Sequence, residues 1–142
     1  MVHKHRVKKF YLKLKEMSEN KDDDTVALCF DFIQNLPLPN IPIQEVFYIY
    51  QLWLNVFCIH DVKTNKAQIY LYHEGQANKS LDEICSFLLH YLKERVSSGV
   101  KHLVLFSDGP SSRNKNHNVV RFLMNLCDRG VFETVTHYFP VR

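Results

Sequence analysis

Glycine is scarce in this chain, which has only four glycines among its 142 residues, and none of them belongs to a glycine-rich phosphate-binding loop. The sequence also contains no Gly-x-Ser-x-Gly motif, no Cys-x-x-Cys pair and no histidine near a cysteine at zinc-ligand spacing. The longest nearly uncharged stretch, Val46 to Ile59, is too short and too rich in β-branched and aromatic residues for a membrane helix. These absences argue against a P-loop domain, a serine hydrolase, a zinc site, a small-molecule cofactor and a membrane span.

The spacing of the four cysteines indicates a reducing, intracellular environment. Cys29, Cys58, Cys85 and Cys127 lie far apart, each within an apolar stretch, so we expect reduced core residues and no disulfides. The N-terminus is charged and lacks the apolar core of a signal peptide. The sequence therefore predicts a soluble intracellular protein. With a hydrophobic share of 46%, it predicts a single packed domain that folds alone.

Positive charge gathers near the N-terminus. The net charge is only +3, but residues 3–15 contain no acid and hold several basic residues: His3, Lys4, His5, Arg6, Lys8, Lys9, Lys13 and Lys15. The simplest interpretation is the solvated side of an amphipathic helix, and the alternatives are contact with nucleic acid or nuclear import. An acidic run, residues 22–24, follows. We expect residues 1–24 to form a basic helix and an acidic linker, and residues 25–142 to form the main domain.

Hydrophobic periodicity and turn signals predict the other elements. Leu36 to Pro42 contains three prolines, which predict a stiff loop without regular hydrogen bonding. Ser80 and Glu83 predict a capping box at a helix start, and Gly130 predicts a helix end. The expected elements in chain order are a basic amphipathic helix (5–18), a strand (25–32), a hairpin (46–62 and 67–73), a helix (81–96), a strand (102–106), a helix (around 119–127) and a strand (132–141). A helix between two strands favours parallel neighbours, so the strands at 25–32 and 102–106 should lie side by side.

Two aspartates end these two strands. Asp31 follows the apolar run Thr-Val-Ala-Leu-Cys-Phe, and Asp108 follows Leu-Val-Leu-Phe-Ser. The carboxyl ends of neighbouring parallel strands lie roughly 4.8 Å apart, which would let both carboxylates bind one divalent metal ion, Mg²⁺ or Mn²⁺. With a third acid, such a pair suits two-metal phosphoryl transfer.

Each candidate has a structural alternative. Asp31 could accept hydrogen bonds from the backbone of Gln34 or Asn35, and Ser107-Asp108-Gly109-Pro110 is ordinary turn chemistry. Glu83 could supply the third acid, but its capping position explains it without catalysis, and Glu74 suits a solvated turn. The strand histidines suit hydrogen-bonded, partly buried core positions: His60, His73 and His102.

Several motifs together carry a family resemblance. They are Phe-Asp31-Phe-Ile-Gln-Asn-Leu-Pro-Leu-Pro, Gln51-Leu-Trp-Leu, Ile59-His-Asp, and Phe106-Ser-Asp108 followed by Asn114-Lys-Asn116. With the element order, the stretch from about His5 to Arg142 resembles the ribonuclease H-like, DDE-type transposase-derived domains of insect and other animal mobile elements. The resemblance implies an α/β fold, namely a ribonuclease H-like mixed sheet of about five strands with flanking helices, plus the N-terminal amphipathic helix.

The resemblance also implies site residues. Asp31 matches the first acid of the triad and Asp108 the second, while the third would follow Arg142, so we expect this chain to lack that segment. The family pattern after the second acid reads Asn-Cys-Gly-Gly-Gln, where this chain has Gly109-Pro110-Ser111-Ser112-Arg113. We therefore expect weak or absent activity, as in a domesticated copy.

The sequence leaves three hypotheses for function. The first is a metal-dependent nuclease or integrase-type domain, with DNA favoured over RNA, a nuclear location and Asp31, Asp108 and Glu83 as catalytic candidates. Its phosphate-binding candidates are Lys4, Arg6, Lys8, Lys9, Arg113 and Lys115. The second is a non-catalytic module retained from a transposon. The third is a homodimer through the last strand.

Overall fold

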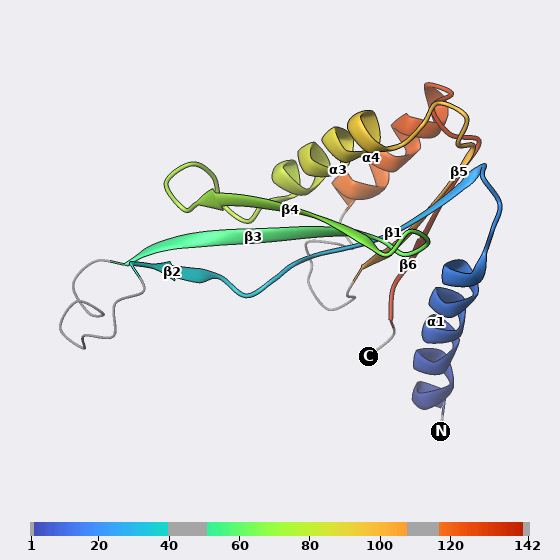
Figure 1. The fold of residues 1–142 in the computed structure, drawn as a ribbon, viewed down its shortest axis with the longest axis horizontal. Coiled ribbons are helices and arrows are strands. Elements are labelled where there is room, and N and C mark those ends of the chain that lie inside the picture. The colour runs from blue at the N-terminus through green and yellow to red at the C-terminus, as the bar shows by residue number, and fades with distance from the viewer. Residues whose placement is uncertain (1, 40–50, 108–116, 141–142) are drawn as a thin grey trace.

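The order of helices and strands follows the predicted one, with one additional short strand (Figure 1). The computed structural model describes residues 2–39, 51–107 and 117–140, and it describes side chains from Val7 onward. The elements are α1 (Val2–Glu19), β1 (Thr25–Phe32), β2 (Leu36–Leu38), β3 (Leu52–Asp61), β4 (Lys66–His73), α3 (Leu81–Arg95), β5 (His102–Ser107), α4 (His117–Asp128) and β6 (Thr134–Tyr138).

Six strands form one mixed sheet in the order β2-β3-β1-β5-β6, with β4 also paired to β3. β3 is antiparallel to both β1 and β4, whereas β5 is parallel to both β1 and β6. An antiparallel unit of three strands, continued by two parallel strands that each follow a helix, is the ribonuclease H-like arrangement. The predicted fold class is confirmed, and so is the predicted parallel pairing of β1 with β5.

The proline-rich segment was predicted as a loop without regular pairing, and this prediction is wrong for its first three residues. Leu36 pairs with Leu54 and Leu38 with Leu52, so β2 is a short antiparallel partner of β3. Only one proline, Pro37, falls inside β2, and β2 lies at the edge of the sheet. An edge strand tolerates proline because the missing N–H can face away from the neighbouring strand.

One face of the sheet is covered by α3 and α4, as Figure 1 shows. Alternate residues of β1 and β5 point to this face and are almost fully buried, including Leu28, Phe30 and Leu105. Ile84 of α3 and Val119 of α4 pack on them and are fully buried. Gly130 ends the α4 region with φ +71°, and Val131 N donates to Leu126 O at 3.0 Å, which confirms the predicted glycine helix end.

The opposite face of the central strands is covered by α1. Phe10, Leu14 and Met17 of this helix pack around Ala27 of β1 and Phe106 of β5. The predicted amphipathic helix is therefore confirmed, although it extends from Val2 to Glu19 and is longer than the 5–18 expected. Among the helices that the structure describes, none has the length and apolar character needed to cross a membrane.

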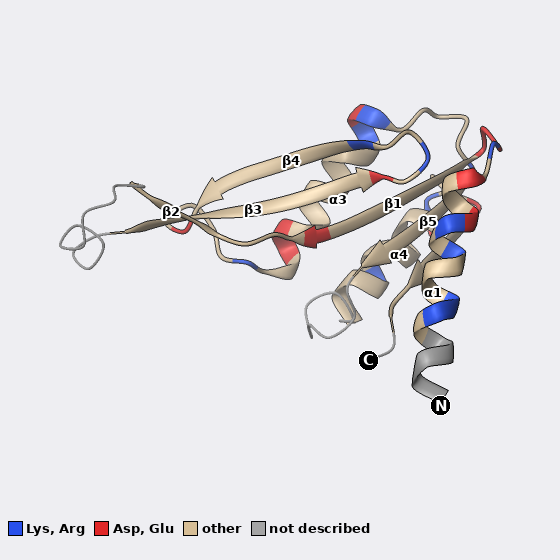
Figure 2. Cartoon of the chain, turned by 60° about the horizontal axis from the view of Figure 1, so that its bottom comes forward, with Lys and Arg blue, Asp and Glu red and all other residues tan. Residues whose placement is uncertain are grey.

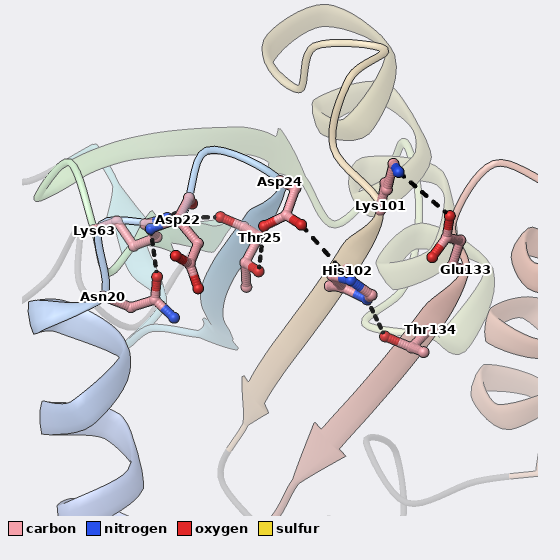
Figure 3. A network of polar contacts seen from close by, with 9 residues as sticks. All are labelled: Asn20, Asp22, Asp24, Thr25, Lys63, Lys101, His102, Glu133 and Thr134. Atoms are coloured by element: carbon pink, nitrogen blue, oxygen red, sulfur yellow. Dashed lines mark hydrogen bonds and ion pairs between the residues drawn. The ribbon is translucent and has the colours of Figure 1, made fainter.

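A network of polar contacts joins the linker after α1 to the amino ends of the parallel strands (Figure 3). Lys63 Nζ donates to the carbonyl oxygens of Asp22 and Thr25, and the contact with Thr25 is 2.8 Å long. His102 Nε2 lies 3.8 Å from Asp24 Oδ2. The acidic linker therefore has a structural role at the end of the sheet opposite to Asp31.

Candidate metal and nucleic-acid site

The candidate site lies where β1 and β5 end. Their parallel register runs from Thr25 and His102 to Phe30 and Ser107. Asp31 is the residue after Phe30, and Asp108 is the residue after Ser107. Asp108 lies outside the described residues, so joint binding of a metal by the two aspartates stays a prediction. The strand pairing on which that prediction depends is in place.

Asp31 lies on the face of the sheet that α1 covers. Side chains alternate along a strand, so Asp31 shares a face with Ala27 and Cys29, which belong to or pack against the α1 cluster. Its side chain is half-buried, and its Oδ1 accepts a hydrogen bond from the N–H of Phe32 at 2.8 Å. Asp31 is therefore a backbone acceptor, but the donor is Phe32, and a bond from Gln34 or Asn35 stays a prediction.

The thiols beside Asp31 are poor metal ligands. Cys58 is the partner of Asp31 on β3, and Cys29 lies two residues before Asp31 on β1. Burial raises the pKa of the Cys29 thiol, and the charge of Asp31 and then Cys58 add to the effect. Burial also raises the pKa of Cys58. Of these side chains, the Asp31 carboxylate suits a hard divalent ion such as Mg²⁺ or Mn²⁺ best, and binding of such an ion stays a prediction.

Glu83 forms the predicted capping box at the start of α3. Its Oε2 accepts from Ser80 N at 3.1 Å and also from the Ser80 hydroxyl. Lys79 Nζ, just before α3, lies 5.1 Å from the centre of the Phe32 ring, which packs on the face of the sheet opposite to the one that Asp31 shares. Glu83 therefore has a structural role in α3, and its catalytic role stays a prediction. Across residues 2–39, 51–107 and 117–140, no group of three His, Cys, Asp or Glu side chains is arranged to hold a metal ion.

The predicted phosphate-binding residues fall into three groups. Lys8 and Lys9 are exposed on α1, and Figure 2 shows basic residues recurring along this helix. Lys4 and Arg6 belong to the same helix, but their side chains are not among those described. Arg113 and Lys115 lie outside the described residues. Lys8 and Lys9 are therefore the predicted phosphate-binding residues whose side chains the structure describes, and their helix covers the face of the sheet that Asp31 shares.

Sequence reasoning missed His137 of β6. Its Nε2 lies 2.8 Å from the Ser107 hydroxyl, and its ring contacts Phe30 at 5.6 Å between centroids. Burial lowers the pKa of His137 to about 4, so the imidazole is neutral near pH 7. These neighbours, Phe30 of β1 and Ser107 of β5, are distant in sequence, and Ser107, the nearer one, is 30 residues away. No local pattern around residue 137 pointed to them.

The three strand histidines have different environments. His60 Nε2 lies 3.0 Å from Asn65 Oδ1, and His102 Nδ1 lies 2.7 Å from the Thr134 hydroxyl, which confirms hydrogen-bonded positions for both. For His73 the prediction stays open, since its buried Nδ1 has no hydrogen-bond partner among the described atoms. The sharp turn at Gly75 lies directly against this ring.

Comparison with known proteins gives a structural likeness. No protein-family model and no curated protein matches the chain. Among solved structures, a chain described as "Crystal structure of the Mos1 Strand Transfer Complex" superposes with a TM-score of 0.47 at 10% sequence identity. The match covers 99% of this chain and 41% of that chain, so this protein spans less than half of the solved chain's length. A likeness of this size does not by itself define a family or a function.

Proposed function

We propose that this protein is a transposase-derived, ribonuclease H-like domain that acts on nucleic acid through a divalent metal ion bound by Asp31 and Asp108. One observation carries the proposal. β1 and β5 are parallel neighbours, and their last paired residues, Phe30 and Ser107, directly precede the two aspartates. Open α/β sheets bind ligands at the carboxyl ends of parallel strands, and this is the end where both acids stand in the sequence.

The metal has a defined task in this proposal. Mg²⁺ or Mn²⁺ held by the carboxylates of Asp31 and Asp108 would polarise a phosphate and activate water or a 3′-hydroxyl. Glu83 is the third acid that the sequence offers, but it caps α3 on the face of the sheet opposite to the one that Asp31 shares, so the proposal does not depend on it.

Nucleic acid would bind along the basic surface. Lys8 and Lys9 are exposed on α1, and α1 covers the face of the sheet that Asp31 shares. Lys4, Arg6, Arg113 and Lys115 complete the proposed phosphate contacts. DNA is the favoured substrate, which would place the protein in the nucleus. Each lost phosphate contact should lower the salt dependence of binding by about one unit of slope.

Manganese binding tests the proposal. Isothermal titration with Mn²⁺ should show a site in the full chain whose affinity falls at least about tenfold in Asp31→Asn and in Asp108→Asn, since each carboxylate is a direct ligand. Asp128→Asn is the matched control, because Asp128 is exposed at the end of α4 and should leave affinity unchanged. A plasmid-nicking assay in Mn²⁺ then tests turnover. If Asp31→Asn binds Mn²⁺ as tightly as the wild type, the metal site is refuted.

A second candidate is a non-catalytic module retained from a transposon. Glu83 is engaged as a helix cap, which favours this alternative. It predicts salt-sensitive binding of a 20-base-pair DNA without Mn²⁺ binding or nicking. A homodimer through β6, the strand at the sheet edge, belongs to this alternative, and a strict monomer in size-exclusion chromatography would remove it.

A further inference from the structure

An apolar groove lies between α1 and the end of β6. It has a volume of about 600 Å³. Its walls include Phe10 and Leu12 of α1 and Tyr138 and Phe139 of the β6 end. Leu12 is 56% exposed and the adjacent Tyr11 is 61% exposed, so α1 has a second apolar surface besides the one packed on the sheet. Exposed apolar surface of this kind on a fixed helix marks interaction sites.

The helix that forms this groove is held in place. Phe10 packs edge-on against Phe106 at 5.6 Å between ring centroids, and Met17 is only 7% exposed. One side of α1 is therefore fixed on the sheet, while the side bearing Leu12 stays open. A partner would meet a groove that exists before binding, which reduces the conformational entropy lost on association.

Charge at the groove selects the partner. Lys9 and Lys13 border it, and residues 3–15 contain no acid. Glu16 lies at the other end and holds Lys13 Nζ at 2.9 Å, and this hydrogen bond raises the pKa of Lys13. The uncompensated positive charge therefore lies toward Lys9. A second copy of this chain would bring a second basic helix against the first, which repulsion disfavours.

The aromatic rings distinguish a peptide from nucleic acid. Base stacking needs an open ring face, but Tyr138 is stacked on Phe106 at 5.2 Å and Phe139 lies against His137 at 4.0 Å. Leu12, at 56% exposure, is the open aliphatic side chain of the groove, and it suits leucine-like side chains. We propose that this groove binds an acidic amphipathic helical segment of a partner protein, with its apolar residues against Leu12 and its carboxylates toward Lys9.

Fluorescence anisotropy with a defined probe tests this proposal. The probe is a labelled 18-residue peptide with leucine at positions i, i+3, i+4 and i+7 and glutamate at most others, as the helix-in-groove mode requires roughly this pattern. It should bind the full chain, and Leu12→Ser should weaken binding about tenfold through lost apolar contact. Leu71→Ser is the matched control, because Leu71 is 60% exposed on β4, far from the groove. Lys9→Gln should weaken binding and reduce its salt dependence.

Four outcomes would overturn the proposal. They are no binding of the peptide, equal binding of a scrambled peptide of the same composition, equal loss in Leu12→Ser and Leu71→Ser, and tighter, Leu12-dependent binding of a single-stranded oligothymidine. Circular dichroism of each variant checks that it is folded, and the exposure of both leucines makes unfolding an insufficient explanation for loss. The peptide should bind Asp31→Asn as it binds the wild type, so failure of the metal site leaves this test unaffected.

Discussion

Acid should destabilise this protein through His137. The pKa of this imidazole lies near 4 in the folded chain because burial disfavours its charged form, whereas the usual value is 6.5. The unfolded chain therefore binds a proton more readily than the folded chain. Above pH 6.5 the titration of His137 does not lower the free energy of unfolding. As pH falls from 6.5 toward 4, it lowers the free energy of unfolding progressively.

The size of the effect follows from the two pKa values. The difference between 6.5 and about 4 corresponds to at most about 3 kcal/mol of unfolding free energy, reached only below pH 4. At pH 5 the imidazole would be mostly protonated when unfolded and mostly neutral when folded. Because pH 5 lies between the two pKa values, we expect a loss of about 2 kcal/mol between pH 7.5 and pH 5.

Urea unfolding at the two pH values measures this loss. His137→Gln keeps a polar group for the Ser107 hydroxyl but cannot take up a proton, so its unfolding free energy should fall by about 2 kcal/mol less than that of the wild type. His117→Gln, at an exposed position, should keep the wild-type pH dependence. Equal pH dependence of the wild type and His137→Gln would refute the reasoning, as would an NMR titration of His137 centred near pH 6.5.

Two further predictions concern helix ends. Ser80→Ala removes the cap of α3 and should lower stability by about 1 kcal/mol in urea unfolding, whereas Glu83→Gln keeps an acceptor for Ser80 N and should cost less; equal losses would contradict the capping role. Gly130→Ala places a side chain at φ +71° and should lower the free energy of unfolding, measured by thermal denaturation, by about 1 kcal/mol. Gly99→Ala, with open space around its Cβ position, should lower it less.

The arrangement of the strands could be predicted because it follows from local rules. The segment between β1 and β5 contains the hairpin and a helix, and a helix between two strands favours a parallel pair. Ser80 and Glu83 defined the start of that helix, α3. The same rules failed at β2. Proline is normally a sign of a loop, and only the pairing of Leu36 and Leu38 with a strand 16 residues later reveals an edge strand.

The candidate site was only partly predictable. Asp31 was identified because a carboxylate at the end of an apolar strand is unusual, and its place at the end of β1 agrees with that reasoning. His137 was not identified, since its environment depends on Phe30 and Ser107 from distant strands. The groove beside Leu12 was missed because a helix sequence reveals its apolar residues without revealing which of them the sheet leaves uncovered.

The pairing of β1 with β5 has a consequence for synthesis of the chain. Thr25 pairs with His102, so roughly 77 residues separate the two halves of the strand pair. A nascent chain that has released only its first 100 residues from the ribosome would possess α1, the hairpin and α3, yet β1 would still lack its parallel neighbour. Any binding of metal by Asp31 together with Asp108 would thus begin only after Asp108 has left the ribosome.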